Sequence, residues 1–298
     1  MKPESIKKLP KERNSSATRC LFSDLWIPQI SFAGLFAILL LSVFFLGSCS
    51  RKPQVEAQAP QAPDLVVGME LAYPPFEMTD TQGNPSGVSV DLAKALGEYL
   101  QRKVVIQNIR FDGLIPELKS GKIDIIISSM TATPERAQAI DFSDSYLKTG
   151  LCLLVRTNSS IQSILEANNA GQTIVVKKGT TGNLYAAQQI KNAQVVVLEK
   201  ESACVLELVQ GKADAFIYDQ MSTYENWQKN KETTRAILTP FQQESWAMGI
   251  RKGNDDLKTQ VNKFLADFRA KKGFDALGDR YLAEQKAAFK KLGIPFYF

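Results

Sequence analysis

Residues 123–136 read IDIIISSMTATPER, and this stretch indicates both the fold and its chemistry. The apolar run at residues 123–128 predicts a buried core strand, and Thr133 followed by Pro134 is a typical helix start, with Thr133 as the N-cap. Arg136 then falls in the first helical turn, where free backbone N–H groups and a guanidinium converge. Because no glycine-rich phosphate loop accompanies it, we expect Arg136 to bind a small carboxylate.

The composition argues against several classes of function. The chain has 298 residues, a formal net charge of +5 and no histidine. Residues 1–48 hold six Lys and Arg against three Asp and Glu, so the rest carries 30 against 28, which gives no support to nucleic-acid binding. The cysteines show no paired metal-ligand spacing, so we expect no metal site, no cofactor and no histidine-based catalysis. Cys152 and Cys204 are expected to be buried free thiols.

The N-terminus has the pattern of an export signal. Six basic residues lead into an apolar run at residues 32–46, which is too short for a comfortable membrane span and has the length of a signal-peptide core. The run ends in Leu46-Gly47-Ser48-Cys49, which resembles a bacterial lipobox. This resemblance implies cleavage after a signal peptide at residues 1–48 and lipidation of Cys49, with palmitate among the acyl chains. A plain N-terminal membrane anchor is the alternative.

Residues 49–63 predict a flexible tether. They contain three prolines and no apolar periodicity, and fully extended they would reach about 45–50 Å. The folded part would therefore stand clear of the membrane while it stays attached.

From Asp64 on, short apolar strands alternate with helical patterns, which is typical of parallel α/β sheets. One series has predicted strands at 65–69, 104–106 and 123–128 with helices at 91–100 and 116–120. A second has strands at 174–176, 195–198 and 213–218 with helices at 183–190 and 202–210. Extended segments at 148–155 and 246–251 connect them. We therefore predict an α/β protein of two lobes joined by a two-segment hinge, with the ligand cleft between them.

The predicted boundaries assign residues 64–153 and 248–298 to lobe 1 and residues 154–247 to lobe 2. The helical patterns at 255–270, 274–282 and 283–292 are expected to pack back on lobe 1.

Polar and aromatic side chains follow the predicted strands. Because ligands of open α/β sheets bind at the carboxyl ends of strands, these side chains should line the cleft. They are Glu70, Tyr73, Phe111, Ser129, Thr131 and Arg136 from lobe 1, and Lys177, Thr180, Thr181 and Asp219 from lobe 2. Arg136 and Asp219 would match the carboxylate and the ammonium of a zwitterion. The alternatives are a core aromatic for Tyr73 and a solvated loop lysine for Lys177.

Five stretches of the chain resemble one known family. They are residues 68–77 (GMELAYPPFE), 87–92 (GVSVDL), 111–116 (FDGLIP), 133–136 (TPER) and 140–143 (IDFS). These resemble the polar amino-acid branch of the periplasmic solute-binding proteins of ABC transporters, over residues 64–281. The resemblance implies the periplasmic-binding-protein fold of type II. Many relatives carry an Asp where this chain has Ser89.

The resemblance also implies roles for the cleft residues. Arg136, Thr131 and the Ser129 backbone would hold the α-carboxylate of the ligand. Asp219, aided by the Ser129 carbonyl, would hold the α-ammonium. Tyr73 and Phe111 would sandwich the ligand side chain, and the loop that carries Thr180 and Thr181 would close on the carboxylate.

Specificity depends on Glu70 and Lys177. A Glu70–Lys177 pair in the pocket presents one acceptor and one donor, which fits the amide of glutamine, our first choice. If Lys177 turned to solvent, Glu70 would suit arginine or lysine, the second choice. If Lys177 made the contact, glutamate or aspartate would follow as the third.

The function that we expect is binding without turnover. The protein would be a monomer, anchored to a bacterial membrane in the periplasm or at the cell surface, and would deliver an amino acid to a membrane permease. Because the chain has no Walker motif, the energy would come from an ATPase subunit on another chain. One alternative is a prephenate or arogenate (cyclohexadienyl) dehydratase on the same scaffold, with Glu70 and Lys177 as acid and base. Another is a lipoprotein that reports its ligand to a receptor.

Overall fold

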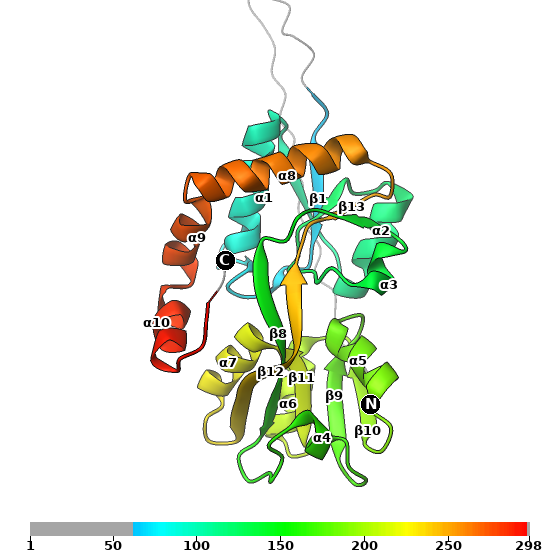
Figure 1. The fold of residues 1–298 in the computed structure, drawn as a ribbon, viewed down its shortest axis with the longest axis vertical. Coiled ribbons are helices and arrows are strands. Elements are labelled where there is room, and N and C mark those ends of the chain that lie inside the picture. The colour runs from blue at the N-terminus through cyan, green and yellow to red at the C-terminus, as the bar shows by residue number, and fades with distance from the viewer. Residues whose placement is uncertain (1–61, 297–298) are drawn as a thin grey trace, which may run out of the picture. The chain divides into compact units, whose positions relative to one another are not determined.

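The computed structural model describes residues 62–296 of the chain. The predicted signal peptide, the predicted lipidation site Cys49 and nearly all of the predicted tether lie outside these residues. Within residues 62–296, the structure contains no helix with the length and apolar character needed to cross a membrane. This part of the chain forms two α/β lobes, each built on its own five-stranded sheet (Figure 1).

The sheet of lobe 1 has the order β5-β1-β6-β13-β7. Its strands are β1 (Leu65–Met69), β5 (Val104–Asn108), β6 (Ile125–Ile126), β7 (Asp141–Phe142) and β13 (Gly249–Ile250). Strands β5, β1 and β6 are parallel, whereas β13 runs antiparallel to both of its neighbours. Strand β1 is almost wholly buried because apolar side chains pack on both faces of the sheet, which explains its continuous run of apolar residues.

Helices and a small sheet complete lobe 1. The helices are α1 (Val88–Leu100), the 3-10 turn η1 (Phe111–Gly113), α2 (Leu114–Ser120), α3 (Pro134–Ala137), α8 (Asp255–Ala270) and α9 (Gly273–Tyr281). The small sheet consists of β2 (Ala72–Tyr73), β3 (Glu77–Thr79) and β4 (Pro85–Ser86). Helix α1 begins earlier than the predicted residue 91, because Gly87 at φ 117° turns the chain where a Cβ would lie 2.4 Å from the Phe76 carbonyl oxygen.

The sheet of lobe 2 repeats this layout with the order β10-β9-β11-β8-β12. Its strands are β8 (Leu147–Arg156), β9 (Thr173–Lys177), β10 (Gln194–Leu198), β11 (Ala215–Asp219) and β12 (Thr234–Trp246). Its helices are α4 (Ile164–Ala167), α5 (Thr181–Gln189), α6 (Glu201–Val209) and α7 (Gln220–Lys229). Three parallel strands are again followed by an antiparallel one, which confirms the predicted duplicated architecture.

The two connections between the lobes run beside each other as β8 and β12 (Figure 1). Residues 151–155 of β8 pair with β11 of lobe 2, whereas residues 147–150 pair only with β12, the other connection. The first crossing therefore comes before Leu151, and the predicted boundary between residues 153 and 154 falls inside β8. The apolar pattern could not locate the crossing, because β8 stays buried on both faces after it has entered lobe 2.

The last helix, α10 (Ala283–Lys291), corrects another expectation. Helices α8 and α9 pack on α1 of lobe 1 as predicted, but α10 packs beside α7 of lobe 2 (Figure 1). The Phe289 side chain is 1% exposed, and its ring lies 5.3 Å from that of Tyr224. The Gln285 amide donates a hydrogen bond to Glu225 at 2.7 Å. The C-terminal helix is therefore a third link between the lobes.

The predicted state of the two described cysteines is confirmed. Cys152 on β8 and Cys204 on α6 are both free and buried. Burial raises the pKa of the Cys204 thiol to about 12 and moves that of Cys152 in the same direction, so neither is a ready nucleophile.

Candidate functional site

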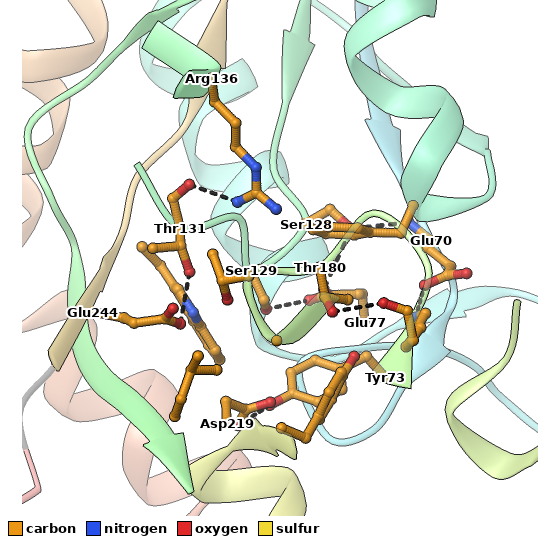
Figure 2. Close-up of a pocket in the computed structure, with 17 residues that line it drawn as sticks. Glu70, Tyr73, Glu77, Ser128, Ser129, Thr131, Arg136, Thr180, Asp219 and Glu244 are labelled. Atoms are coloured by element: carbon orange, nitrogen blue, oxygen red, sulfur yellow. Dashed lines mark hydrogen bonds and ion pairs between the residues drawn. The ribbon is translucent and has the colours of Figure 1, made fainter. Parts of the chain in front are cut away.

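A cavity of about 40 Å³ lies between the two lobes at the carboxyl ends of their strands. All ten side chains predicted as ligand contacts line it: Glu70, Tyr73, Phe111, Ser129, Thr131, Arg136, Lys177, Thr180, Thr181 and Asp219. Figure 2 shows Arg136 and Asp219 at opposite ends, with Ser129 and Thr180 between them. The topology of the two sheets therefore brings together residues that lie far apart in the sequence.

Arg136 occupies one end of the cavity. It lies in helix α3, whose N-cap Thr133 accepts a hydrogen bond from the Arg136 backbone N–H at 3.2 Å, and Pro134 is the first helical residue as predicted. The guanidinium donates to the carbonyl oxygens of Thr131 in lobe 1 at 2.6 Å and Gly179 in lobe 2 at 3.0 Å. It also lies 5.4 Å from the centre of the Phe111 ring. Burial lowers its pKa to about 10, so it remains a cation at neutral pH.

Thr180 and Thr181 face this end from lobe 2. They begin helix α5, with Thr180 as N-cap and Thr181 as its first residue, and the Thr180 hydroxyl accepts from the Asn183 backbone N–H at 3.3 Å. The N-terminus of a nine-residue helix thus points its free N–H groups toward the same region as the Arg136 guanidinium, which favours an anion.

Glu244 is a residue at this end that the sequence reasoning missed. The Thr131 hydroxyl donates to it at 3.0 Å, and the Gln242 amide does so at 3.3 Å. Burial raises the pKa of Glu244, although hydrogen bonds from Thr181 and Thr131 oppose the shift. Its position two residues before the buried Trp246, on the same face of β12, is a signal that could have placed it in the cleft.

Asp219 occupies the opposite end. It is the N-cap of α7 and accepts hydrogen bonds from the backbone N–H groups of Met221 at 3.0 Å and Ser222 at 3.1 Å. The Tyr73 hydroxyl of lobe 1 also donates to Asp219, at 2.6 Å. Burial raises the pKa of Asp219 to about 7 against these hydrogen bonds. A cationic partner would favour its charged form.

Tyr73 lies in the core and also reaches the cavity. Its ring stacks on Phe76 at a centroid distance of 5.4 Å and lies edge-on to Trp246 at 5.9 Å, so it belongs to the core. Its hydroxyl nevertheless reaches the cavity and bonds to Asp219 across the interface of the lobes.

Lys177 and Glu70 form an ion pair along the side of the cavity. Lys177 is the last residue of β9 and only 2% exposed, so the alternative of a solvated loop lysine is wrong. Its ammonium also lies 5.6 Å from the centre of the Phe111 ring. Phe111 thus lies under both buried cations of the site, a placement that stabilises each by about 0.5–2 kcal/mol.

Glu77 is a second carboxylate that the candidate residues did not include. It is 1% exposed and accepts hydrogen bonds from the hydroxyls of Ser89 at 2.6 Å and Ser129 at 3.0 Å. Burial raises its pKa to about 8 in spite of these bonds, so it holds a proton at neutral pH. Ser129 has φ 49°, an uncommon conformation for a residue other than glycine, and this turn brings it to Glu77. Ser89, noted as a departure from relatives, is therefore a partner of Glu77.

The charged side chains of the site are arranged to bind a small ligand. Within the part of the chain that the structure describes, no group of three or more His, Cys, Asp or Glu side chains is arranged to hold a metal ion. The available chemistry is that of one buried guanidinium, one buried ammonium and several buried carboxyl groups, arranged around a small cavity.

Comparison with known proteins finds amino-acid-binding proteins among the relatives of this chain. The L-arginine-binding protein of Pseudomonas aeruginosa is 30% identical over 226 residues, which cover 73% of this chain and 87% of the relative. Other relatives, 25–29% identical, are named as binding proteins for cystine, histidine and glutamine.

Solved structures match the same region. An ancestral arginine-binding protein bound to arginine gives a TM-score of 0.70 at 31% identity, covering 74% of this chain and 99% of that one. An ancestral amino acid-binding protein described as a precursor of cyclohexadienyl dehydratase gives 0.67 at 33% identity, covering 73% and 95%. The two-lobe fold is therefore confirmed. Residues 65–284 match the family model as well, and the chain belongs to the bacterial extracellular solute-binding proteins, family 3.

Proposed function

We propose that the protein binds a zwitterionic polar amino acid in the cleft between its lobes and delivers it to the permease of an ABC importer. The observation that carries this proposal is the placement of Arg136 and Asp219, a buried cation and a buried carboxyl group at opposite ends of one cavity, on different lobes. Such a pair complements an α-carboxylate and an α-ammonium only when the lobes are together.

The contacts of the ligand follow from this placement. The α-carboxylate would take the guanidinium of Arg136, the hydroxyl of Thr131 and the N-terminus of α5 at Thr180 and Thr181. The α-ammonium would take Asp219. The cavity of about 40 Å³ has room for only about three waters, which is less than an amino acid needs. The guanidinium of Arg136 now donates to the carbonyl oxygens of Thr131 and Gly179, so a ligand carboxylate would have to replace these two hydrogen bonds.

Binding would therefore be coupled to movement of the lobes about β8 and β12. The ligand contacts groups on both lobes, so it shifts the equilibrium toward the closed form by its differential affinity for that form. Micromolar affinity corresponds to about −8 kcal/mol, which two charge-assisted contacts and an aromatic wall can supply.

Glutamine remains the first choice for the ligand side chain. Lys177 is buried and paired with Glu70, so the side chain would meet one acceptor and one donor, as an amide requires. Arginine and lysine are second, supported by the relatives named for arginine. Glutamate and aspartate are third, because two carboxyl groups, those of the half-buried Glu70 and the buried Glu77, line this cavity.

The cellular arrangement belongs to the same proposal. Residues 1–48 would be removed as a signal peptide, and a lipid on Cys49 would anchor a monomeric protein in the periplasm or at the cell surface, tethered by residues 49–63. The permease and its ATPase subunits would be separate chains. A receptor in place of the permease would make the protein a sensor, with the same ligand site.

A dehydratase is the second candidate, and two observations favour it. One matching structure is described as a precursor of cyclohexadienyl dehydratase, and the buried Glu77 has a pKa of about 8, within the range of a general acid. That structure is nevertheless itself described as an amino acid-binding protein, and the relative from Pseudomonas aeruginosa is named as a binding protein too. Loss of prephenate or arogenate in the presence of the protein would identify the enzyme.

A thermal-shift screen against the twenty amino acids tests the proposal. The protein is first unfolded and refolded, which removes amino acids carried through purification. A ligand at a thousand times its Kd raises the free energy of unfolding by about 4 kcal/mol, a plainly visible shift. If only glutamine gave a shift, this would support the proposal that the Glu70–Lys177 pair binds the side-chain amide of the ligand. No shift with any of the twenty would refute amino-acid binding in this form.

A further inference from the structure

Glu244 lines the ligand cavity at the end that Arg136 occupies. It is 6% exposed and belongs to β12, the second connection between the lobes. Backbone hydrogen bonds on both sides of Trp246, each 3.0 Å long, hold β12 against the segment that carries Thr131. The backbone at Glu244 is therefore fixed beside the proposed carboxylate site.

The carboxyl group of Glu244 accepts hydrogen bonds that we have assigned to the ligand carboxylate. The Thr131 hydroxyl of lobe 1 donates to its Oε2 atom at 3.0 Å, and Figure 2 shows the two groups side by side. Thr181 of lobe 2 donates to the same carboxyl group. In the structure, Glu244 therefore uses donors from both lobes that a ligand carboxylate would need.

The charges at this end make a second anion unfavourable. Arg136 is the buried cation here; burial lowers its pKa, and the charge of Glu244 is the largest effect that opposes the shift. A ligand carboxylate on Arg136 would place two anions beside one cation, in a site shielded from water. When two carboxylates share such a site, the pKa of one of them rises strongly, and the pair retains a proton.

The remaining charged and titratable groups around Glu244 leave the second anion unbalanced. Lys148 and Glu135 are exposed, so solvent and salt screen their charges. The buried Lys177, which also lines the ligand cavity, is already paired with Glu70. The other groups are neutral or acidic, namely Cys152 on β8, Tyr185 on α5, Asp219 on β11 and Glu77 on β3.

Glu244 also lines a larger cavity, which we call the outer cavity. It has a volume of about 640 Å³ and is bordered by α3 of lobe 1 and α5 of lobe 2, and Thr131 and Thr181 line it too. A polar space of this size holds many waters. Solvent therefore reaches the side of Glu244 that faces away from the ligand cavity, and a proton has a short route to it.

We propose that Glu244 takes up a proton from solvent when the ligand binds, and that its protonated carboxyl group then donates a hydrogen bond to the α-carboxylate of the ligand. Glu244 thereby changes from a competitor for Thr131 and Thr181 into a contact of the ligand. One proton enters with each ligand, so a single negative charge remains beside Arg136. The proposal rests on the amino-acid binding proposed above and adds a dependence on pH. Because the complex holds a proton that the free protein lacks, affinity falls as pH rises.

Glu244→Gln tests this role, because a glutamine side chain is neutral and can donate a hydrogen bond at every pH. Isothermal titration with L-glutamine and L-arginine gives Kd for both proteins from about pH 5.5 to about pH 8.5. We expect the ratio of the wild-type Kd to the variant Kd to rise at least tenfold over this range, and by up to about tenfold per pH unit where one proton is taken up. Asp219 and Glu77 also titrate here, but both remain in the variant, so the ratio isolates Glu244.

Glu117→Gln is the matched control. Glu117 pairs with Lys122 at 2.9 Å on the surface of lobe 1 and lines neither the ligand cavity nor the outer cavity. Its Kd values should follow those of the wild-type protein at every pH.

A measurement on the wild-type protein alone covers the case in which Glu244→Gln fails to fold. Titrations in two buffers of different ionisation enthalpy count the protons taken up per ligand. Below its pKa of about 7, Asp219 releases a proton when the ligand ammonium binds, which has the opposite sign. Net uptake should therefore appear above about pH 7.

The outcomes separate this proposal from the proposed function. A ratio that stays constant with pH, or wild-type protein that takes up no proton above pH 7, would overturn the role of Glu244 and leave amino-acid binding standing. A pH dependence that persists in Glu244→Gln and disappears in Glu77→Gln would assign the proton to Glu77 and overturn it as well. If the wild-type protein bound neither amino acid at any pH, the glutamine and arginine assignments and the role of Glu244 would fall together.

Discussion

The conservative substitution Arg136→Lys tests the assignment of the ligand carboxylate most sharply. It keeps one positive charge at the end of a flexible side chain but removes the planar fork of the guanidinium. In the structure that fork already spans the lobes, because its two terminal nitrogens donate to the carbonyl oxygens of Thr131 and Gly179 at 2.6 and 3.0 Å. A carboxylate that takes over these donors would be held by two parallel hydrogen bonds.

The expected loss follows from the hydrogen bonds. Arg136 is 6% exposed, so a bond from it to a carboxylate is charge-assisted and shielded from water. Lysine would keep one such bond and lose the other, which costs about 1.5–3 kcal/mol. Since 1.4 kcal/mol is a factor of ten, Kd should rise by about 10- to 150-fold. The unfolding temperature without ligand should fall modestly, because the bonds to the two carbonyl oxygens also weaken.

Isothermal titration with L-glutamine and L-arginine measures the loss, and Arg235→Lys is the matched control. The Arg235 guanidinium also donates to two backbone carbonyl oxygens, those of Ser159 at 3.2 Å and Ile161 at 2.7 Å, but it lines neither the ligand cavity nor the outer cavity. It should lose stability without losing affinity. Affinity unchanged in Arg136→Lys, or reduced equally in both variants, would refute the assignment of the carboxylate to Arg136.

Three further changes test other parts of the structure. Lys177→Met removes the donor of the Glu70–Lys177 pair, so the ratio of glutamine to arginine affinity should fall at least tenfold by titration; an unchanged ratio contradicts the role of the pair. Burial raises the pKa of Glu77 from 4.5 to about 8. Between these two pH values the folded protein holds a proton on Glu77 that the unfolded chain releases. The free energy of unfolding should therefore fall as pH rises, by up to about 1.4 kcal/mol per pH unit. Denaturant titrations across this range should show a shallower fall for Glu77→Gln, and equal slopes would count against the shift. Phe289→Ala should cost about 3–5 kcal/mol in denaturant unfolding, because α10 would lose its contact with Tyr224 on lobe 2; a loss below about 1 kcal/mol would mean that α10 is only loosely attached.

Much of the site could be anticipated from the order of strands and helices. The sequence places Arg136 after a buried strand and a Thr-Pro helix start, and the structure has that N-cap and that first helical residue. It places Asp219 at the end of a strand of the second series, where the structure has it. The reason is that strand and helix periodicity are local properties, and the carboxyl ends of parallel strands necessarily share one edge of a sheet.

The hydrogen-bond contacts within the site were harder to predict from the sequence. Glu77 stands inside a quoted motif, yet its contacts with Ser89 and Ser129 depend on how α1 and the turn at Ser129 pack together. Glu244 lies on a strand of mixed burial, and its contact with Thr131 exists only because β12 returns to lobe 1. A polar residue in a sequence gives little sign of whether it will be buried.

The sequence by itself determined the two α/β series, the two crossings between them and the set of side chains at the strand ends, because each of these follows from short-range patterns of apolar residues and turns. Only the tertiary structure decided which side chains meet. Tyr73 and Asp219 are 146 residues apart and bond at 2.6 Å, and α10 reaches lobe 2 rather than lobe 1. Such contacts depend on how the lobes approach each other, and that is settled by packing across the whole chain, which no local pattern records.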